Sequence, residues 1–204
     1  MQMMQRLAKV KITRVAAGTC LLFAACAQNS DSTVPPPATA AAVPTAGPNV
    51  MADLSRDVAG IEKKFVDLAK AMPDASYAYR PMAGVRSVRE VFLHIAGENY
   101  LLPSMFGAAI PAETGITDFQ STTAYEKRDI KKDSVVANLD ASFAFIKRAM
   151  AADSAAIMSS EVDFFGTKMS RQAAWIGTVT HMHEHLGQAI AYARSNKVVP
   201  PWSK

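Results

Sequence analysis

Cysteine is nearly absent from this chain, and where it occurs limits the available chemistry. Both cysteines, Cys20 and Cys26, lie within the first 26 of the 204 residues. The rest of the chain therefore offers no disulfide, no thiolate nucleophile and no cysteine ligand for a metal. Any metal held by the body of the protein must take its ligands from other side chains.

An excess of positive charge is also missing from most of the chain. The formal net charge is +4, but Arg6, Lys9, Lys11 and Arg14 lie among the first 26 residues, which contain no acidic residue. Of the 22 basic residues, 18 are left to balance the 18 acidic ones. These 18 form no basic stripe with interleaved aromatics, so we expect no nucleic-acid partner.

Residues 1–26 are typical of a bacterial secretory signal. The basic stretch precedes an apolar run, "VAAGTCLLFAA", that is too short to span a membrane. The sequence "FAAC" ending at Cys26 resembles a lipobox, although Phe23 stands where leucine is usual. We expect an exported lipoprotein with lipid on Cys26. Cleavage after Ala25 or Ala27, which would give a freely secreted periplasmic protein, is the alternative.

Residues 27–50 differ sharply in composition from residues 51–204. The stretch "STVPPPATAAAVPTAGP" cannot bury enough apolar surface to order itself, so we predict a disordered tether. Residues 51–204 are long enough for one domain with a hydrophobic core. Contact with a membrane is expected only through the lipid anchor.

Four segments of the domain carry apolar residues at helical spacing, and strand signals are almost absent. In the second segment Ser87 and Glu90 form a capping-box pattern, and Pro103 should kink or end the helix. Asp133 is the expected cap of the third helix. The pattern predicts an all-α four-helix bundle. The four predicted helices are 54–72, 87–105, 133–152 and about 170–195.

Two segments between the predicted helices lack a clear periodicity of apolar residues. Residues 107–131 are polar, and we expect a loop that can include a short helical turn. Residues 159–170, "SSEVDFFGTKMS", are expected to form a turn that packs Phe164 or Phe165 against the bundle.

Three of the four histidines lie between residues 181 and 185. On a helix His181 and His185 share one face, whereas His183 points to the far side. Such a pair supplies two imidazole ligands for a divalent metal, and His94, on the interior stripe of the second helix, can supply a third. Zinc, nickel, copper and iron all accept three imidazoles. The alternative is that these histidines are hydrogen-bonded structural residues.

Three further polar residues lie beside the predicted metal ligands. Gln188 and Tyr192 continue the face of the fourth-helix pair and are candidates for orienting the imidazoles. Glu98 lies one turn beyond His94 and is the candidate catalytic residue. It could act as a general base, as a fourth ligand, or as a solvated charge at the opening of the bundle.

The stretches "VREVFLHIAGENYLLPSMFG" and "THMHEHLGQAIAYARSNKVVPPWS" together resemble the DinB-like (DinB/YfiT) superfamily. This resemblance implies an up-down-down-up four-helix bundle and a dimer. It also implies a divalent metal bound by a second-helix histidine and a His-x-x-x-His pair on the fourth helix. His94, His181 and His185 match those positions, while Asn196 and Lys197 stand where the family commonly has glycine.

Three histidine ligands would leave coordination positions open, as in a catalytic site acting on a small molecule. The resemblance implies thiol-dependent transferase or isomerase chemistry with cytosolic thiols. Export disfavours such thiols and favours metal-dependent hydrolysis or attack by another nucleophile. A non-catalytic metal-binding or small-ligand-binding envelope protein is the second hypothesis. The third is a bundle with structural histidines that binds other proteins.

Overall fold

The structure is a computed structural model that describes residues 49–203. The predicted signal, 1–26, and all but the end of the predicted tether, 27–50, lie outside the described residues, so these assignments stay predictions. Within residues 49–203, none of the helices combines the length and the apolar character needed to cross a bilayer.

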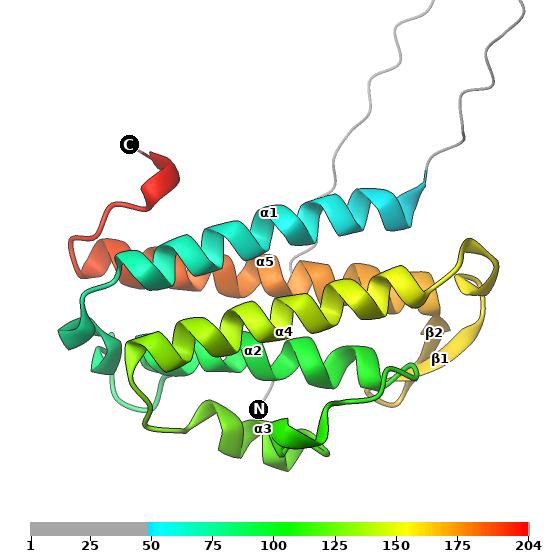
Figure 1. The fold of residues 1–204 in the computed structure, drawn as a ribbon, viewed down its shortest axis with the longest axis horizontal. Coiled ribbons are helices and arrows are strands. Elements are labelled where there is room, and N and C mark those ends of the chain that lie inside the picture. Colours follow the sequence, from blue (N-terminus) through cyan, green and yellow to red (C-terminus); the bar gives the residue numbers. More distant parts are fainter. Residues whose placement is uncertain (1–48, 204) are drawn as a thin grey trace, which may run out of the picture. The chain divides into compact units, whose positions relative to one another are not determined.

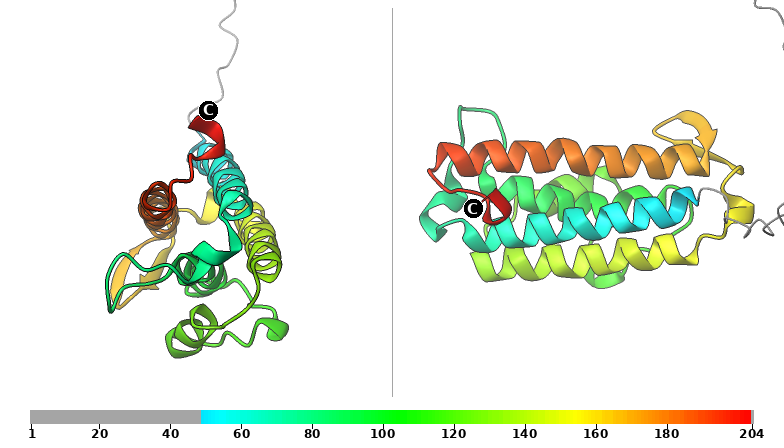
Figure 2. Two further views of the ribbon diagram at one scale, coloured as in Figure 1. Left: turned by 90° about the vertical axis from the view of Figure 1, so that its left-hand side faces the viewer. Right: turned by 90° about the horizontal axis from the view of Figure 1, so that it is seen from above.

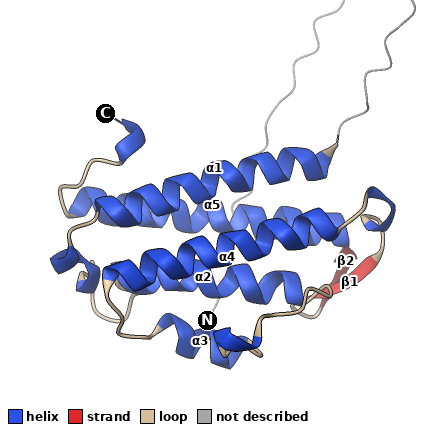
Figure 3. Ribbon diagram, in the orientation of Figure 1, coloured by secondary structure: helices blue, strands red, loops and turns tan. Residues whose placement is uncertain are grey.

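Four long helices make a bundle (Figures 1 and 3). Figure 1 shows α2 and α4 running in one direction and α1 and α5 in the other. The predicted all-α bundle with up-down-down-up topology is therefore confirmed. The four helices are α1 (Val50–Ala71), α2 (Val88–Ser104), α4 (Lys132–Ala152) and α5 (Arg171–Ser195).

The starts of α2 and α5 agree with the sequence, and that of α4 does not. The Ser87 side chain accepts from the Glu90 backbone N–H and Glu90 reciprocates, while the Ser170 side chain caps α5. The predicted cap of α4 was wrong, because the helix begins at Lys132 and Asp133 lies in its first turn. The helix dipole favours an acidic residue in the first turn as well as at the N-cap. The sequence alone therefore does not distinguish these two positions for Asp133.

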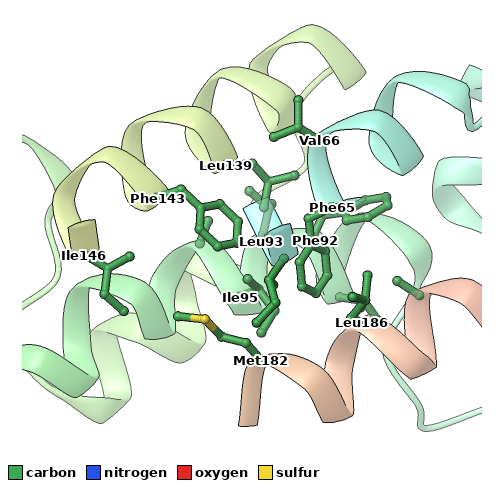
Figure 4. Packing of buried hydrophobic residues seen from close by; sticks show 14 of the residues in the cluster. Phe65, Val66, Phe92, Leu93, Ile95, Leu139, Phe143, Ile146, Met182 and Leu186 are labelled. Atoms are coloured by element: carbon green, nitrogen blue, oxygen red, sulfur yellow. The ribbon is translucent and has the colours of Figure 1, made fainter. Parts of the chain in front are cut away.

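The apolar core lies among the four long helices (Figure 4). The Phe65 ring of α1 meets the Phe92 ring of α2 edge-on, with centroids 6.4 Å apart, and lies 6.0 Å from the Phe143 ring of α4. Met182 and Leu186 of α5 complete the packing. The predicted helix 54–72 carries apolar residues at helical spacing from Leu54 to Met72, and this stripe is confirmed as part of the core, since five of its residues are at most 1% exposed: Val58, Ile61, Phe65, Leu68 and Met72.

Helix α2 is buried on almost every side, unlike the one-sided helix that its stripe suggested. A further helix, α3 (Phe119–Glu126), covers its outer face, as the end-on view in Figure 2 shows. The prediction of a loop over 107–131 was therefore wrong in this part. Helix α3 is short and begins with a capping box between Asp118 and Ser121. Because few of its residues are apolar, its sequence shows little of the apolar periodicity that indicates a helix.

Residues 159–170 contain an antiparallel hairpin, where the sequence predicted only a turn. Strands β1 (Glu161–Phe164) and β2 (Thr167–Ser170) pair with Phe164 opposite Thr167. Four-residue strands are too short to show a clear alternation. Phe164 packs against the bundle, with its ring 6.3 Å from that of Phe106, as predicted. Short 3₁₀ helices cover Asp74–Ala78, Ala112–Thr114, Ala155–Ile157 and Pro201–Ser203.

Candidate metal centre

Three histidines from two helices meet inside the bundle. One donor nitrogen from each of His94, His181 and His185 lies within 4.8 Å of the others. The Nε2 atoms of His94 and His185 are 3.1 Å apart. The predicted convergence is confirmed, and so is the opposite placement of His183, whose Nε2 lies 2.7 Å from Asp57 on the exposed side of α5.

Hydrogen bonds behind two of the rings set their tautomers. His94 Nδ1 lies 3.0 Å from Glu126 Oε2, and His185 Nδ1 lies 2.7 Å from Gln188 Oε1. The Glu126 carboxylate accepts from His94 Nδ1, and Gln188 Oε1 accepts from His185 Nδ1. In the neutral form that binds a metal, each ring then keeps a lone pair on Nε2. The two Nε2 lone pairs therefore face each other and repel. A cation placed between them would convert this repulsion into attraction.

Gln188 is itself held in place by Tyr192. Its Nε2 donates to the Tyr192 hydroxyl at 3.2 Å, which leaves Oε1 directed at His185. The structure thus places both residues behind His185, in the predicted position for orienting an imidazole.

His181, the third member of the cluster, has an unpaired ring nitrogen. Its Nε2 is buried and has no hydrogen-bond partner among the described residues. Leaving such an atom without a partner is unfavourable, unless a ligand satisfies it. Burial, reinforced by the neighbouring His185 and His94, lowers the pKa of His181 to about 4. Burial also lowers the pKa of His185. Both imidazoles are therefore neutral at pH 7, as metal ligands must be.

The spacing of the donor atoms fits one small cation. Tetrahedral zinc with bonds of about 2.0–2.1 Å holds its nitrogen ligands roughly 3.4 Å apart. The closest pair here is separated by 3.1 Å, and no pair exceeds 4.8 Å. Small side-chain rotations would suffice to bring all three to bonding distance. The three imidazoles could hold one metal ion, although the spacing leaves the element open.

Glu126 is a residue of this centre that sequence reasoning missed. It lies at the end of α3, in the stretch predicted to be a loop, and accepts from Arg86 Nε at 2.8 Å as well as from His94. Burial by itself would raise the pKa of Glu126, but the hydrogen bonds from His94 and Arg86 outweigh it and lower the pKa. The capping pattern at Asp118 is the signal that could have revealed the helix carrying it.

Glu98 is buried, with 5% of its surface exposed, so the solvated-charge interpretation was wrong. Its Oε1 lies 4.0 Å from His94 Nδ1, and Glu98 is not one of the three clustered residues. Burial raises the pKa of Glu98, and the nearby His94 offsets part of that effect. A carboxyl group in this setting keeps its proton to a higher pH than an exposed glutamate does.

A cavity of about 480 Å³ opens onto the histidines. Its polar wall contains the three imidazoles together with Glu98, Arg86 and Glu184. This volume is within the usual range for small-molecule sites. The three histidines and the buried carboxyl group therefore face one shared space.

A family comparison places this chain among known proteins. The family model described as the DinB superfamily matches residues 59–189, a range that includes the three histidines, Glu98 and Glu126. The chain belongs to the DinB superfamily. The resemblance carried by the second-helix and fourth-helix stretches of the sequence is thereby confirmed.

Solved structures support the same fold. A DinB-like protein from Bacillus cereus aligns with a TM-score of 0.62 at 14% identity, over 72% of this chain and 93% of that one. A conserved protein from Enterococcus faecalis gives 0.56 at 20% identity, over 72% and 96%. A DinB-like protein from Bacillus subtilis gives 0.53 at 17% identity, over 72% and 93%. At these identities the likeness concerns the fold alone. A comparison with curated proteins gave no match.

Proposed function

We propose that this DinB-superfamily chain binds one divalent metal through His94, His181 and His185 and uses it on a small molecule. The His181 ring carries the proposal, because its buried Nε2 has no hydrogen-bond partner among the described residues and the ring lies in a cluster where the Nε2 atoms of His94 and His185 are 3.1 Å apart. A metal satisfies all three atoms at once. Zinc, nickel and iron are the candidate elements.

The surroundings of the three imidazoles favour a catalytic role. A metal with three protein ligands keeps a position for water or substrate, where it lowers the pKa of a bound water and polarises a bound carbonyl. Glu126 and Gln188 hold His94 and His185 in the tautomer that presents Nε2. Glu98, on the wall of the same cavity, is placed to take up and return a proton. Metal-dependent hydrolysis or group transfer fits these roles.

The proposal includes export and attachment to a membrane. Its support is the basic and apolar leader, the "FAAC" stretch ending at Cys26 and the Pro-rich segment after it. Metabolic labelling with a radioactive fatty acid tests this part. Label should appear on the wild-type chain and be absent from Cys26→Ala, whereas equal labelling of both would contradict lipidation at this residue.

Elemental analysis of the purified full chain tests metal binding. We expect about one metal ion per wild-type chain and far less in His94→Ala and in His181→Ala. The His183→Ala chain is the matched control, because His183 lies between His181 and His185 in the sequence but faces Asp57 outside the cluster. Equal metal content in all four chains would remove the basis of the proposal.

Glu98→Gln distinguishes catalysis from binding alone. With the zinc-loaded chain and 4-nitrophenyl acetate as the probe, we expect hydrolysis above background that falls about a hundredfold in Glu98→Gln at unchanged zinc content. A zinc-loaded wild-type chain that adds nothing to the background rate would favour a metal-binding or ligand-binding envelope protein.

A further inference from the structure

We propose that the ligand of this centre is a small molecule with a metal-binding head and an apolar body of the size of an aromatic ring. In this arrangement the head reaches the histidines and the body lies among Phe119, Phe164 and Phe165, which we call the aromatic vestibule. The inference rests on the proposed function, because the head is bound by the metal.

The first observation is that large apolar side chains gather over the same cavity as the histidines. Phe119 from the start of α3 is 63% exposed, and Phe165 from the hairpin is 55% exposed, yet both line this cavity. Phe164 and Leu102 line it as well. Single exposed apolar residues are common on proteins, but two exposed rings from two elements over one cavity that also contains histidines indicate a ligand site.

The backbone at Phe165 gives a second and independent observation. Phe165 and Gly166 form the two-residue turn of the hairpin, with φ of +54° and +75°. Turns of this kind favour asparagine, aspartate or glycine at the first position, and a bulky residue there is strained. Strained residues cluster at ligand-binding sites. The chain thus keeps an aromatic ring over the cavity at a position where its backbone is unfavourable.

Gly177 provides a third observation, from the opposite wall. It lies one turn before His181 on α5 and lines the cavity. Glycine weakens a helix relative to alanine. A Cβ added at this position would meet the Phe164 ring at 3.5 Å, which is an ordinary contact. The Phe164 ring therefore lies directly over Gly177, and the missing side chain lets the hairpin pack closely on α5 at the wall of the cavity.

These observations give the cavity two chemically different parts. The part formed by α2 and α5 presents imidazoles and the Glu98 carboxyl group, and the part formed by α3 and the hairpin presents aromatic rings. A ligand that uses both must be amphiphilic. A purely polar ligand would leave the vestibule rings exposed to water, and a purely apolar one would leave the metal position unused.

The test compares two probes that share a hydroxamate head, benzohydroxamate and acetohydroxamate, by calorimetric titration of the zinc-loaded full chain. We expect the wild type to bind the phenyl probe about tenfold more tightly or better, because the ring buries apolar area that the methyl group does not. Phe119→Ala and Phe165→Asn should each reduce this preference several-fold. Gly177→Leu, whose side chain would displace the Phe164 ring from the cavity wall, should abolish it.

Matched variants separate the vestibule from general effects. Gly177→Ala adds only the tolerated Cβ and should keep the preference, as should Met82→Ala, whose side chain is 66% exposed and outside the cavity. Phe165→Asn should also raise the thermal unfolding midpoint, because asparagine suits the turn. If Phe165 had only a structural role, Phe165→Asn would not lose the preference for the phenyl probe while its thermal unfolding midpoint rises.

The outcomes distinguish this inference from the proposed function. A wild-type chain that takes up no zinc overturns the proposed function and this inference with it. A zinc-loaded chain that binds the two probes equally overturns only this inference. So does a phenyl preference that survives in Phe119→Ala and Phe165→Asn, and neither of these two substitutions removes a buried core residue.

Discussion

Two clusters of polar side chains lie inside this bundle, and they differ in how completely their hydrogen bonds are satisfied. In the first, Arg171 binds both carboxylate oxygens of Asp153, at 2.6 and 3.0 Å, and Trp175 Nε1 donates to the same carboxylate at 2.7 Å. This cluster, which we call the closed cluster, joins the end of α4 to the start of α5. In the histidine centre, His181 Nε2 has no partner among the described residues.

The comparison shows how a structural polar cluster can be told from a ligand site. The Asp153 carboxylate accepts three hydrogen bonds from donors fixed by the fold, so the closed cluster has no need of a ligand. In the histidine centre Glu126 and Gln188 bind the Nδ1 atoms of His94 and His185, whereas among the described residues the Nε2 atoms of these two rings contact only each other. A buried histidine site whose Nδ1 atoms are fixed by hydrogen bonds, and whose Nε2 atoms lack a suitable partner, is organised for a ligand.

The largest expected effect is that of His185→Ala on zinc binding. Removing one of three ligands should weaken zinc affinity at least about a hundredfold, measured by competition with a chromophoric chelator. Asp153→Ala serves as the comparison, and its zinc affinity should match the wild type. If the two variants lost zinc to the same extent, the distinction between the clusters would fail.

Asp153→Ala should instead show a large loss of stability. The substitution leaves a guanidinium and an indole N–H without their acceptor at a site where only 7% of the Asp153 side chain is exposed. We expect the free energy of unfolding to fall by about 3 kcal/mol, measured by urea denaturation of the metal-free chain. Asp57→Ala, which breaks an exposed pair with His183, should cost less than about 1 kcal/mol.

The pH dependence of the metal-free chain tests the burial of His181. Its pKa is lowered to about 4 in the folded state, against an ordinary value of 6.5, so the unfolded state binds more protons below pH 6.5. Stability should therefore fall as the pH drops from 6.5 towards 4, by about 2 kcal/mol from this group. Thermal or urea unfolding at several pH values measures it. His181→Gln should lose less stability over this range, and equal losses in both chains would contradict the assignment.

The smallest effect is expected for Glu126→Gln. Glutamine can still accept from His94 Nδ1 but no longer supplies the charge that pairs with Arg86. Zinc affinity should fall about tenfold, measured by the same chelator competition. Glu90→Gln removes a carboxylate of equal charge that pairs with Arg80 outside the centre, so it should leave zinc affinity unchanged.

Much of the fold could be predicted because long helices with one apolar face repeat their pattern many times. The first-helix stripe through Phe65 and the fourth helix from Ser170 are examples. Helix α3 and the hairpin were missed because they are short and because contacts distant in sequence stabilise them. A helix of eight residues such as α3 owes its order to packing on α2 more than to its own propensity.

The part of the metal centre that lies on the long helices could be predicted from the sequence. The spacing of His181 and His185 places both on one face, and His94 on the interior stripe of α2 completes the cluster. Glu126 and the aromatic vestibule come from the two elements that the sequence did not reveal. The burial of Glu98 was misjudged as well, because α3 and the hairpin close the side of α2 that a four-helix bundle would leave open to water.

Zinc-edge X-ray absorption on the zinc-loaded full chain tests the central claim most directly. The account predicts about three nitrogen scatterers at roughly 2.0–2.1 Å with the multiple scattering of imidazole, plus one lighter atom from an exchangeable ligand. In His94→Ala the imidazole contribution should fall. A wild-type spectrum without imidazole scattering, or one left unchanged by both His94→Ala and His181→Ala, would contradict a metal centre built from these three histidines.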